Sequence, residues 1–413
     1  MPNSNSNPAI LKVLNLIRVH GPITRAHLGE ISEYSRSTVS INCDKLLESG
    51  LVREEALNTS EPQTKRTQLR INGEAGLIIG IELGATGCEI GICDLSGQLL
   101  AADSAPIDLS NGPEPILLHI RNTIARLSTD AEIIRSRTIL GIGIGLPSSV
   151  DFERGMAVSA AFMPGWNMYP VRDILQEHYR CPVFVDNEVN TMAVGEYSLG
   201  MDRRYKNLLF VKVGTGIGAG IIVNGEIYRG EKGVAGNIGH ISVCGSTVQC
   251  ACGRIGCVEA VAGGGAVARK AEEIRAGGLS PQLDSLYRKR GRLSSKEVQE
   301  AASLGDMKCI ELIKESGIIL GRVLGKINMF FNPSIIIVGG GVTGFGPTYL
   351  SFIREGIIQQ SNPLIHMDLP IKFSTFGDKS GIIGSVMLCI KELFKGGQLL
   401  ESSIRKVEAP GAA

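Results

Sequence analysis

Hydrophobic residues in the first fifty positions recur at helical spacing, and turn-forming residues interrupt them. One set predicts a helix that Gly21-Pro22 ends, and it comprises Ile10, Val13, Leu14 and Ile17. Thr24 caps a second, shorter helix that carries Leu28 and Ile31. A third helix begins after Ser35 and ends at Gly50. Its inward positions are Val39, Cys43, Leu46 and Leu47.

The outer side of the third helix carries groups that bind phosphates and base edges: Ser35, Arg36, Ser37, Thr38, Ser40, Asn42 and Lys45. Two strands follow, at residues 51–53 and 67–71, and the polar loop between them carries Lys65 and Arg66. Helices followed by a β-wing predict a winged helix-turn-helix DNA-binding domain over residues 1–72. A small helical protein-interaction module fits the same hydrophobic pattern, but the basic residues favour DNA.

From Leu77 onward apolar strands alternate with helices, and one design occurs twice, in LIIGIELGATGCEIGICDLSGQLL and in LLFVKVGTGIGAGIIVNGEIYRG. Each copy has a glycine- and threonine-rich turn between two strands, followed by a hairpin turn. Such turns offer backbone N–H groups and a hydroxyl to phosphate oxygens. The candidate phosphate-loop residues are Gly84, Thr86, Gly214, Thr215 and Gly216, with Gly339 and Gly340 after a third apolar strand. The last two are equally consistent with a close-packed turn.

The segment 237–259 concentrates metal ligands among glycines. Three thiols and one imidazole predict a tetrahedral zinc site, and its ligands are His240, Cys250, Cys252 and Cys257. Ordinary buried thiols are the alternative, and Cys244 could replace one ligand. Four protein ligands leave no open coordination position, so the zinc is expected to be structural.

Composition narrows the class of protein. A chain of 413 residues with 43% hydrophobic residues exceeds one ordinary domain. A net charge of only +1 provides no global attraction to polyanions, so DNA contact requires a local surface. The chain shows neither a secretory signal nor an apolar run of membrane-spanning length, which makes the cytoplasm the expected compartment. Outside the zinc segment, six scattered cysteines are interpreted as reduced core thiols.

The long helical segment near residue 320 has glycines at 317, 321 and 325. Four-residue spacing permits close helix approach, either inside the domain or across a subunit interface.

The zinc segment resembles the metal motif of the ROK family of repressors, open reading frames and sugar kinases. Further markers follow in the family's order: the first glycine loop, GLPSSVD, PGWNMYPVRDIL, VDNEVN, the second loop and NPSIIIVGGG. The N-terminal segment resembles the repressor branch, which includes xylose and N-acetylglucosamine repressors. The resemblance implies an α/β fold, a winged helix-turn-helix plus a two-lobed actin-like (ribonuclease H-like, sugar-kinase) domain, with lobes at 73–195 and 196–395 and a loose tail at 396–413.

The same resemblance implies which residues would bind a sugar: Asn187, Glu188, Asn237, His240 and Glu259. Glu259 is also explained as an acid in the first turn of a helix. Kinase relatives have Asp at the positions of Glu82 and Glu188, and Glu at that of Asn237. The longer Glu188 displaces the carboxylate at the position of the catalytic base. No catalytic residue, ATP or Mg²⁺ is therefore expected.

Together these features predict a sugar-responsive transcription regulator, most simply a repressor of carbohydrate-utilisation genes. It would bind operator DNA and a sugar effector, as a homodimer or homotetramer, because palindromic operators need paired modules. One alternative is an ATP-dependent sugar kinase or a bifunctional kinase and regulator. Another is a constitutive DNA-binding protein whose sugar cleft has decayed.

Overall fold

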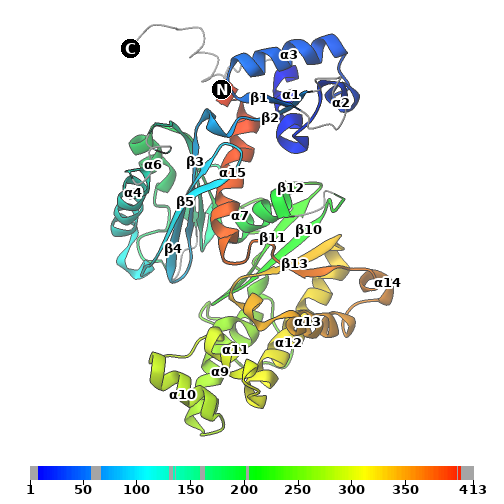
Figure 1. Ribbon diagram of the computed structural model, residues 1–413. Helices are drawn as coiled ribbons and strands as arrows, with labels where there is room; N and C mark the ends of the chain where they lie inside the picture. Colours follow the sequence, from blue (N-terminus) through cyan, green and yellow to red (C-terminus); the bar gives the residue numbers. More distant parts are fainter. Residues whose placement is uncertain are drawn as a thin grey trace.

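The computed structural model describes residues 8–56, 67–129, 134, 136–158, 163–200, 204–397 and 399–400. A small helical unit at the N-terminus lies beside a larger body with two five-stranded sheets (Figure 1). Among the described residues, no helix is both long enough and apolar enough to cross a membrane.

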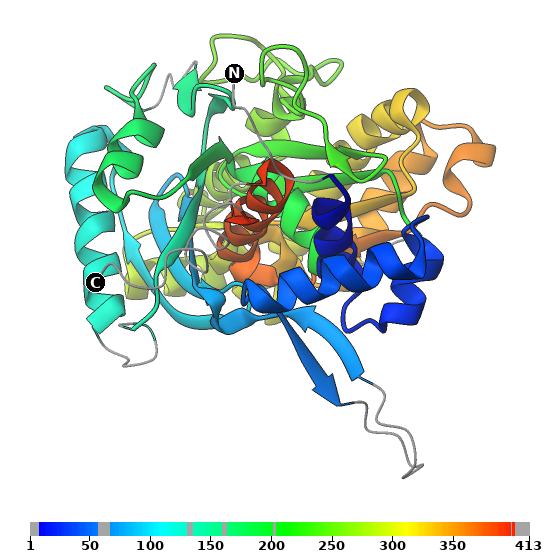
Figure 2. The same ribbon diagram turned by 90° about the horizontal axis from the view of Figure 1, so that it is seen from above.

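The N-terminal unit contains three helices and a two-stranded antiparallel sheet. These are α1 (Pro8–His20), α2 (Arg25–Ile31), α3 (Arg36–Glu48), β1 (Val52–Ala56) and β2 (Thr67–Ile71). The Thr24 and Ser35 side chains accept hydrogen bonds from the N–H groups of His27 and Thr38, so both are helix caps. Seen from above, β1 and β2 project away from the body as a wing (Figure 2).

The first large sheet has the strand order β5-β4-β3-β6-β9. Its strands are β3 (Leu77–Leu83), β4 (Gly87–Asp94), β5 (Leu99–Pro106), β6 (Ile139–Leu146) and β9 (Val183–Asn187). Alternate residues of β3 face opposite cores, so Ile79 packs with α4 (Pro113–Thr129) and α6 (Val171–Tyr179), while Ile78 packs toward α15 (Ser380–Gly396). A short hairpin of β7 (Ser149–Asp151) and β8 (Met156–Val158) follows β6.

The second sheet repeats the first, with the order β12-β11-β10-β13-β14. Its strands are β10 (Leu208–Val213), β11 (Ile217–Val223), β12 (Glu226–Ile227), β13 (Ile335–Gly339) and β14 (Ile371–Phe373). In both sheets the first three strands along the chain pair antiparallel, and the last two strands extend the sheet in parallel from the first strand. The equal topology agrees with the duplicated sequence pattern.

Helices cover the outer face of the second sheet. They are α8 (Val258–Ala262), α9 (Gly264–Ala276), α10 (Pro281–Arg290), α11 (Ser295–Ser303), α12 (Met307–Phe331), α13 (Pro347–Ile358) and α14 (Pro363–His366). The α12 glycines pack inside this lobe, because a Cβ added at Gly321 would lie 2.1 Å from the carbonyl oxygen of Ile353 on α13. Of the two uses open to these glycines, the structure therefore shows packing inside the domain.

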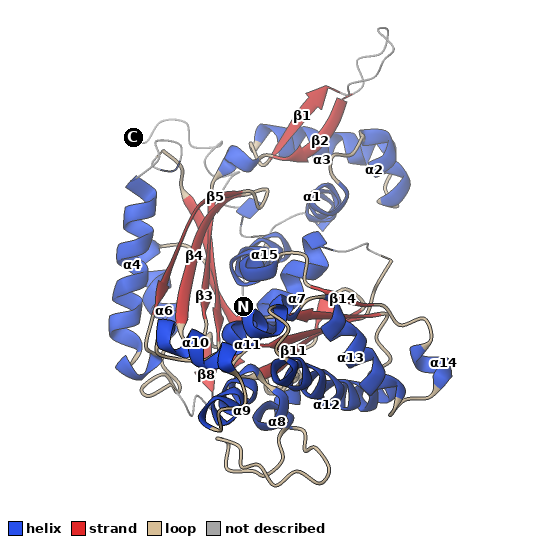
Figure 3. Cartoon of the chain, turned by 60° about the horizontal axis from the view of Figure 1, so that its bottom comes forward, coloured by secondary structure: helices blue, strands red, loops and turns tan. Residues whose placement is uncertain are grey.

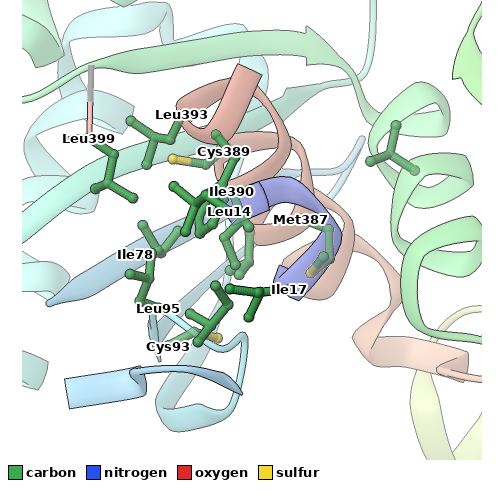
Figure 4. Close-up of a cluster of buried hydrophobic side chains, with 14 of the residues drawn as sticks. Leu14, Ile17, Ile78, Cys93, Leu95, Met387, Cys389, Ile390, Leu393 and Leu399 are labelled. Atoms are coloured by element: carbon green, nitrogen blue, oxygen red, sulfur yellow. The ribbon is translucent and has the colours of Figure 1, made fainter. Parts of the chain in front are cut away.

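Two helices lie between the sheets, α7 (Glu188–Gly195) and α15 (Figure 3). At its C-terminal end α15 also packs on α1, where Leu14 and Ile17 join Ile390 and Leu393 in one buried cluster (Figure 4). The Asn15 amide donates to the Phe394 carbonyl oxygen at 3.2 Å. The N-terminal unit and the larger body therefore share a continuous hydrophobic core.

The cysteines outside the metal-ligand segment are free and buried, as expected of reduced core thiols: Cys43, Cys88, Cys93, Cys181, Cys309 and Cys389.

Candidate functional site

Charged residues meet where β3 and β10 end and α7 begins. We call Glu82, Glu188 and Lys212 the strand-end cluster. The Nζ atom of Lys212 lies 2.5 Å from the Oε2 atom of Glu188. Glu82 is only 8% exposed, and its Oε2 atom has no hydrogen-bond partner among the described residues. An unpaired carboxyl group beside a buried ion pair is costly to fold, so it marks a site where stability is not the only requirement.

The protonation states in this cluster follow from burial and mutual charge. Burial raises the pKa of Glu82 well above its ordinary value of 4.5, an effect that Lys212 opposes and Glu188 reinforces. Burial alone would lower the pKa of Lys212, but the charges of Glu188 and Glu82 outweigh burial and the pKa of Lys212 is raised. Lys212 therefore keeps its positive charge, while Glu82 holds its proton more strongly than an exposed glutamate does.

Lys212 was not among the predicted site residues. The available signal was a single lysine inside the otherwise apolar strand LLFVKV. A charged residue inside such a strand must find a partner or reach solvent. Nothing in the local pattern indicates that the partner comes from α7.

A second buried ion pair, which was not predicted either, joins Arg229 to Asp186, two residues before Glu188. The Nε atom of Arg229 donates to the Oδ2 atom of Asp186 at 2.8 Å. Asp186 is 1% exposed, and its Oδ1 atom accepts hydrogen bonds from the Asn190 side chain and from the Asn187 N–H group. The Arg229 guanidinium lies 3.6 Å from the centre of the Phe152 ring. This pair joins the first sheet to the segment after β12 in the second.

Contacts with two adjacent serines bring together two of the predicted sugar-binding residues, Asn187 and Asn237. The Asn187 amide donates to the Ser148 carbonyl oxygen at 2.8 Å, and the Asn237 amide donates to the neighbouring Ser149 hydroxyl at 3.4 Å. Asn187 also caps α7, so its side-chain oxygen is occupied by the Val189 N–H group. Asn237 is exposed and retains capacity for a ligand.

Glu259 lies between the second glycine loop and the segment that carries His240. Its Oε2 atom accepts a hydrogen bond from the Ile217 N–H group at 2.9 Å, and it is in the first turn of α8. A Cβ added at Gly216 or Gly239 would lie 2.5 or 3.2 Å from the same oxygen. These glycines allow the close approach, and the carboxylate has structural partners besides any ligand.

The glycine turns are more self-contained than the sequence suggested. The N–H groups of Gly84 and Gly214 donate to the carbonyl oxygens of Gly87 and Gly216 within their own turns. Gly340 has a φ of 86°, and a Cβ there would lie 2.6 Å from the Val213 carbonyl oxygen. Close packing against β10 therefore accounts for Gly340. Gly339, Thr86 and Thr215 occupy strand-end or turn positions in the same regions.

The four predicted metal ligands converge. One donor atom from each of His240, Cys250, Cys252 and Cys257 lies within 4.8 Å of the other three. The Cys252 and Cys257 sulfurs are 3.7 Å apart, and the Cys250 sulfur is 3.9 Å from Nδ1 of His240. A tetrahedral site with Zn–S bonds of about 2.3 Å requires ligand separations of about 3.8 Å. The donor set and spacing therefore fit a zinc ion, whereas Cys244 is exposed and outside the group.

The thiols of this group differ in pKa, because the nearby backbone and burial act on them in opposite directions. A hydrogen bond from the Arg254 backbone lowers the pKa of Cys252 to about 6, whereas burial raises that of Cys257 to about 12. Gly253 and Gly256 have φ values of 86° and 78°, which only glycine adopts readily, and these let the loop turn back on itself. The glycines thus lie where the loop must turn for the four candidate ligands to come together.

Comparison with known families identifies the chain. The sequence profile of the ROK family matches residues 78–392. The chain belongs to the ROK family. Both the predicted family and the predicted α/β fold class, a winged helix-turn-helix followed by a two-lobed sugar-kinase-like domain, are confirmed.

This ROK protein is similar to regulators along nearly its whole length. The xylose repressor of Caldicellulosiruptor bescii is 29% identical over 93% of this chain and 95% of the repressor. The crystal structure of a ROK family transcriptional regulator, described as a homologue of the Escherichia coli MLC protein, has a TM-score of 0.79 and 25% identity, covering 97% of this chain and 98% of that one. The glucokinase of Halalkalibacterium halodurans is 31% identical, but over 74% of this chain and 92% of the glucokinase.

In this ROK protein, the predicted DNA-contacting residues divide between surface and core. Ser35, Arg36, Ser37 and Lys45 are exposed, and Thr38 is half-buried. Ser40 is half-buried and accepts a hydrogen bond from Arg25 at 3.2 Å.

The prediction that Asn42 lies on the outer side of α3 is wrong. It is 3% exposed and donates to the Thr38 carbonyl oxygen, because helical geometry turns position 42 toward the core beside Cys43. Ile41, which was not predicted, is 56% exposed on α3. The predicted wing-tip residues Lys65 and Arg66 lie outside the described residues.

Proposed function

We propose that this chain is a sugar-responsive transcription regulator of the cytoplasm, a repressor of carbohydrate-utilisation genes that binds operator DNA and senses a sugar without phosphorylating it. The observation that carries the proposal is the position of α15, which touches both the strand-end cluster and the DNA-binding unit. Full-length similarity to a xylose repressor supports it.

DNA recognition is assigned to α3 and the wing. The exposed side chains at the start of α3 supply donors for phosphates and base edges, and Arg36 brings the positive charge. The exposed Ile41 adds an apolar group suited to a thymine methyl. A single such unit reads a short half-site, so we propose a homodimer or homotetramer on a palindromic operator.

Coupling between sugar and DNA is assigned to α15. At its N-terminal end, a Cβ added at Gly381 would lie 1.3 Å from Oε2 of Glu82, and the Ser385 hydroxyl donates to the Ile81 carbonyl oxygen at 2.8 Å. Its C-terminal end packs on α1. A sugar that binds better to one position of α15 would therefore favour one arrangement of the DNA-binding units, by an amount equal to its difference in binding free energy.

The sugar is proposed to contact Asn187, Glu188, Asn237, His240 and Glu259. Zinc would be held by His240 and the three neighbouring cysteines. With four protein ligands it would supply structure rather than chemistry, by fixing the positions of η4 (Ile238–His240) and the start of α8. Its removal should therefore loosen the sugar site before it disturbs the sheets.

The absence of kinase activity is proposed from Glu188. A general base must be free to accept the sugar proton, but this carboxylate is paired with the Lys212 ammonium. The opposing candidate is a sugar kinase, and the 31% identity to a glucokinase favours it.

Gel-shift titration on DNA from the chain's own upstream region, with and without a panel of sugars, tests the proposal. We expect a shift that at least one sugar changes. A parallel assay with ATP should show no sustained, sugar-dependent ADP release. Such release, abolished by Glu188→Gln, would overturn the proposal in favour of the kinase. DNA binding without a thermal shift by any sugar or sugar phosphate would favour a constitutive DNA-binding protein.

A further inference from the structure

More carboxyl groups than cations gather at the strand-end cluster. Glu89 on β4 is the direct cross-strand partner of Glu82 on β3, so both side chains lie on the same face of the sheet. Lys212 interacts electrostatically with Glu82, Glu89 and Glu188. Three acidic side chains from three elements thus surround one ammonium group.

The arrangement is that of a cation site. Carboxylate oxygens from several directions are the ligands that hard divalent cations prefer. The Oε2 atom of Glu82 is buried without a hydrogen-bond partner among the described residues, so the cluster has ligand capacity to spare. The Lys212 side chain reaches the group from the end of β10, just before the second glycine loop, and its ammonium is held by Glu188.

We infer that the Lys212 ammonium is a resident counter-ion, which occupies the place that a divalent cation would otherwise take between Glu82 and Glu188. The inference rests on the proposed function, because it specifies which class of sugar the proposed site binds. With its cation built in, the site needs no metal-nucleotide. Its remaining acidic groups disfavour anions, so the effector is an uncharged sugar rather than a sugar phosphate or sugar acid.

A substitution follows directly. Lys212→Ala removes the ammonium, leaves the acidic side chains in place and opens space among them. The carboxylates are then without a counter-ion, and a divalent cation such as Mn²⁺ should replace it. Lys212→Met removes the same charge but fills the space, so it should gain no Mn²⁺ site.

Mn²⁺ binding to the zinc-loaded full chain, followed by calorimetry and thermal shift, tests the inference. We expect Lys212→Ala to bind Mn²⁺ at least about tenfold more tightly than the wild type, which corresponds to about 1.4 kcal/mol. The gain should disappear in Lys212→Ala/Glu188→Gln. Lys206→Met, which removes an exposed lysine near the start of β10, is the matched control and should behave as the wild type.

The inference is overturned if Lys212→Ala binds Mn²⁺ no better than the wild type, or if the gain survives Glu188→Gln. If Lys212→Ala does not fold alone, millimolar Mn²⁺ should restore its folding, and failure to do so while Lys212→Met folds counts equally against the inference. Tighter binding of a sugar 6-phosphate than of the parent sugar by the wild type would refute the ligand class. None of these measurements involves DNA, so a failure of the proposed regulatory function would appear separately, in the gel shift.

Discussion

Replacing Arg229 by Met should destabilise the protein strongly, because it leaves the Asp186 carboxylate buried without its counter-ion. Asp186 is 1% exposed, and Arg229 supplies the one hydrogen bond to its Oδ2 atom that we observe among the described residues. Removing one member of a buried ion pair costs about 3–5 kcal/mol. The same substitution also loses the stacking of the guanidinium on Phe152, and an interaction between a cation and an aromatic ring contributes about 0.5–2 kcal/mol.

The double variant Asp186→Asn/Arg229→Met isolates the charge from the packing. It removes both charges and leaves an amide with incomplete hydrogen bonding, which costs about 1–3 kcal/mol. It should therefore be more stable than Arg229→Met alone, by about 2 kcal/mol, although it carries one substitution more.

The chain offers a local probe for this measurement. Trp166 is its single tryptophan and is fully buried in the first lobe, so its fluorescence during guanidinium titration reports unfolding there. Arg154→Met is the matched control, because Arg154 is an exposed arginine on the same β7–β8 hairpin as Phe152 and should contribute at most about 0.5 kcal/mol. A loss below about 1 kcal/mol for Arg229→Met, or a double variant no more stable than the single one, would refute the reasoning.

Three further predictions concern the strand-end cluster, the metal site and DNA. Glu82 has a raised pKa in the fold, so its contribution to stability is fully present below about pH 4.5 and is lost as pH rises toward the folded pKa, by up to about 1.4 kcal/mol per pH unit. Glu82→Gln should therefore gain stability relative to the wild type between about pH 5 and pH 8, and a constant difference across that range would contradict the raised pKa. Metal analysis should find one zinc ion per chain in the wild type and in Cys244→Ser, whereas Cys250→Ser should lose it and unfold at a lower temperature; equal zinc in the two variants would exclude the proposed ligand set. Arg36→Ala should weaken operator binding by about 1–3 kcal/mol in gel shifts with an unchanged melting temperature, and unchanged affinity would remove α3 from the proposed interface.

Local patterns predicted the N-terminal helices and the candidate metal ligands. Helical spacing and caps placed α1 to α3, because a helix start depends on residues within one turn, such as Ser35 and Thr38. The candidate metal ligands could be predicted for a similar reason: His240 and the three cysteines lie in one short segment whose glycines supply the turns. Asn42 shows the limit of predicting which side chains face outward, because a shift of one position along a helix moves a side chain from the surface to the core.

Only the tertiary structure shows which residues far apart in the chain contact each other. Lys212 lies near the end of β10, whereas its partner Glu188 begins α7, which follows β9 of the other sheet. Arg229 likewise reaches Asp186 across the two lobes. No local pattern encodes such pairs, because side-chain partners of this kind are set by how the sheets and α7 pack. The position of α15 has the same origin: its apolar residues predict burial, but only the fold shows that they join the strand-end cluster to the DNA-binding unit. Sequence alone thus determined the family and the elements and predicted the metal ligands, whereas packing decided which charges meet and how the N-terminal unit is joined to the larger body.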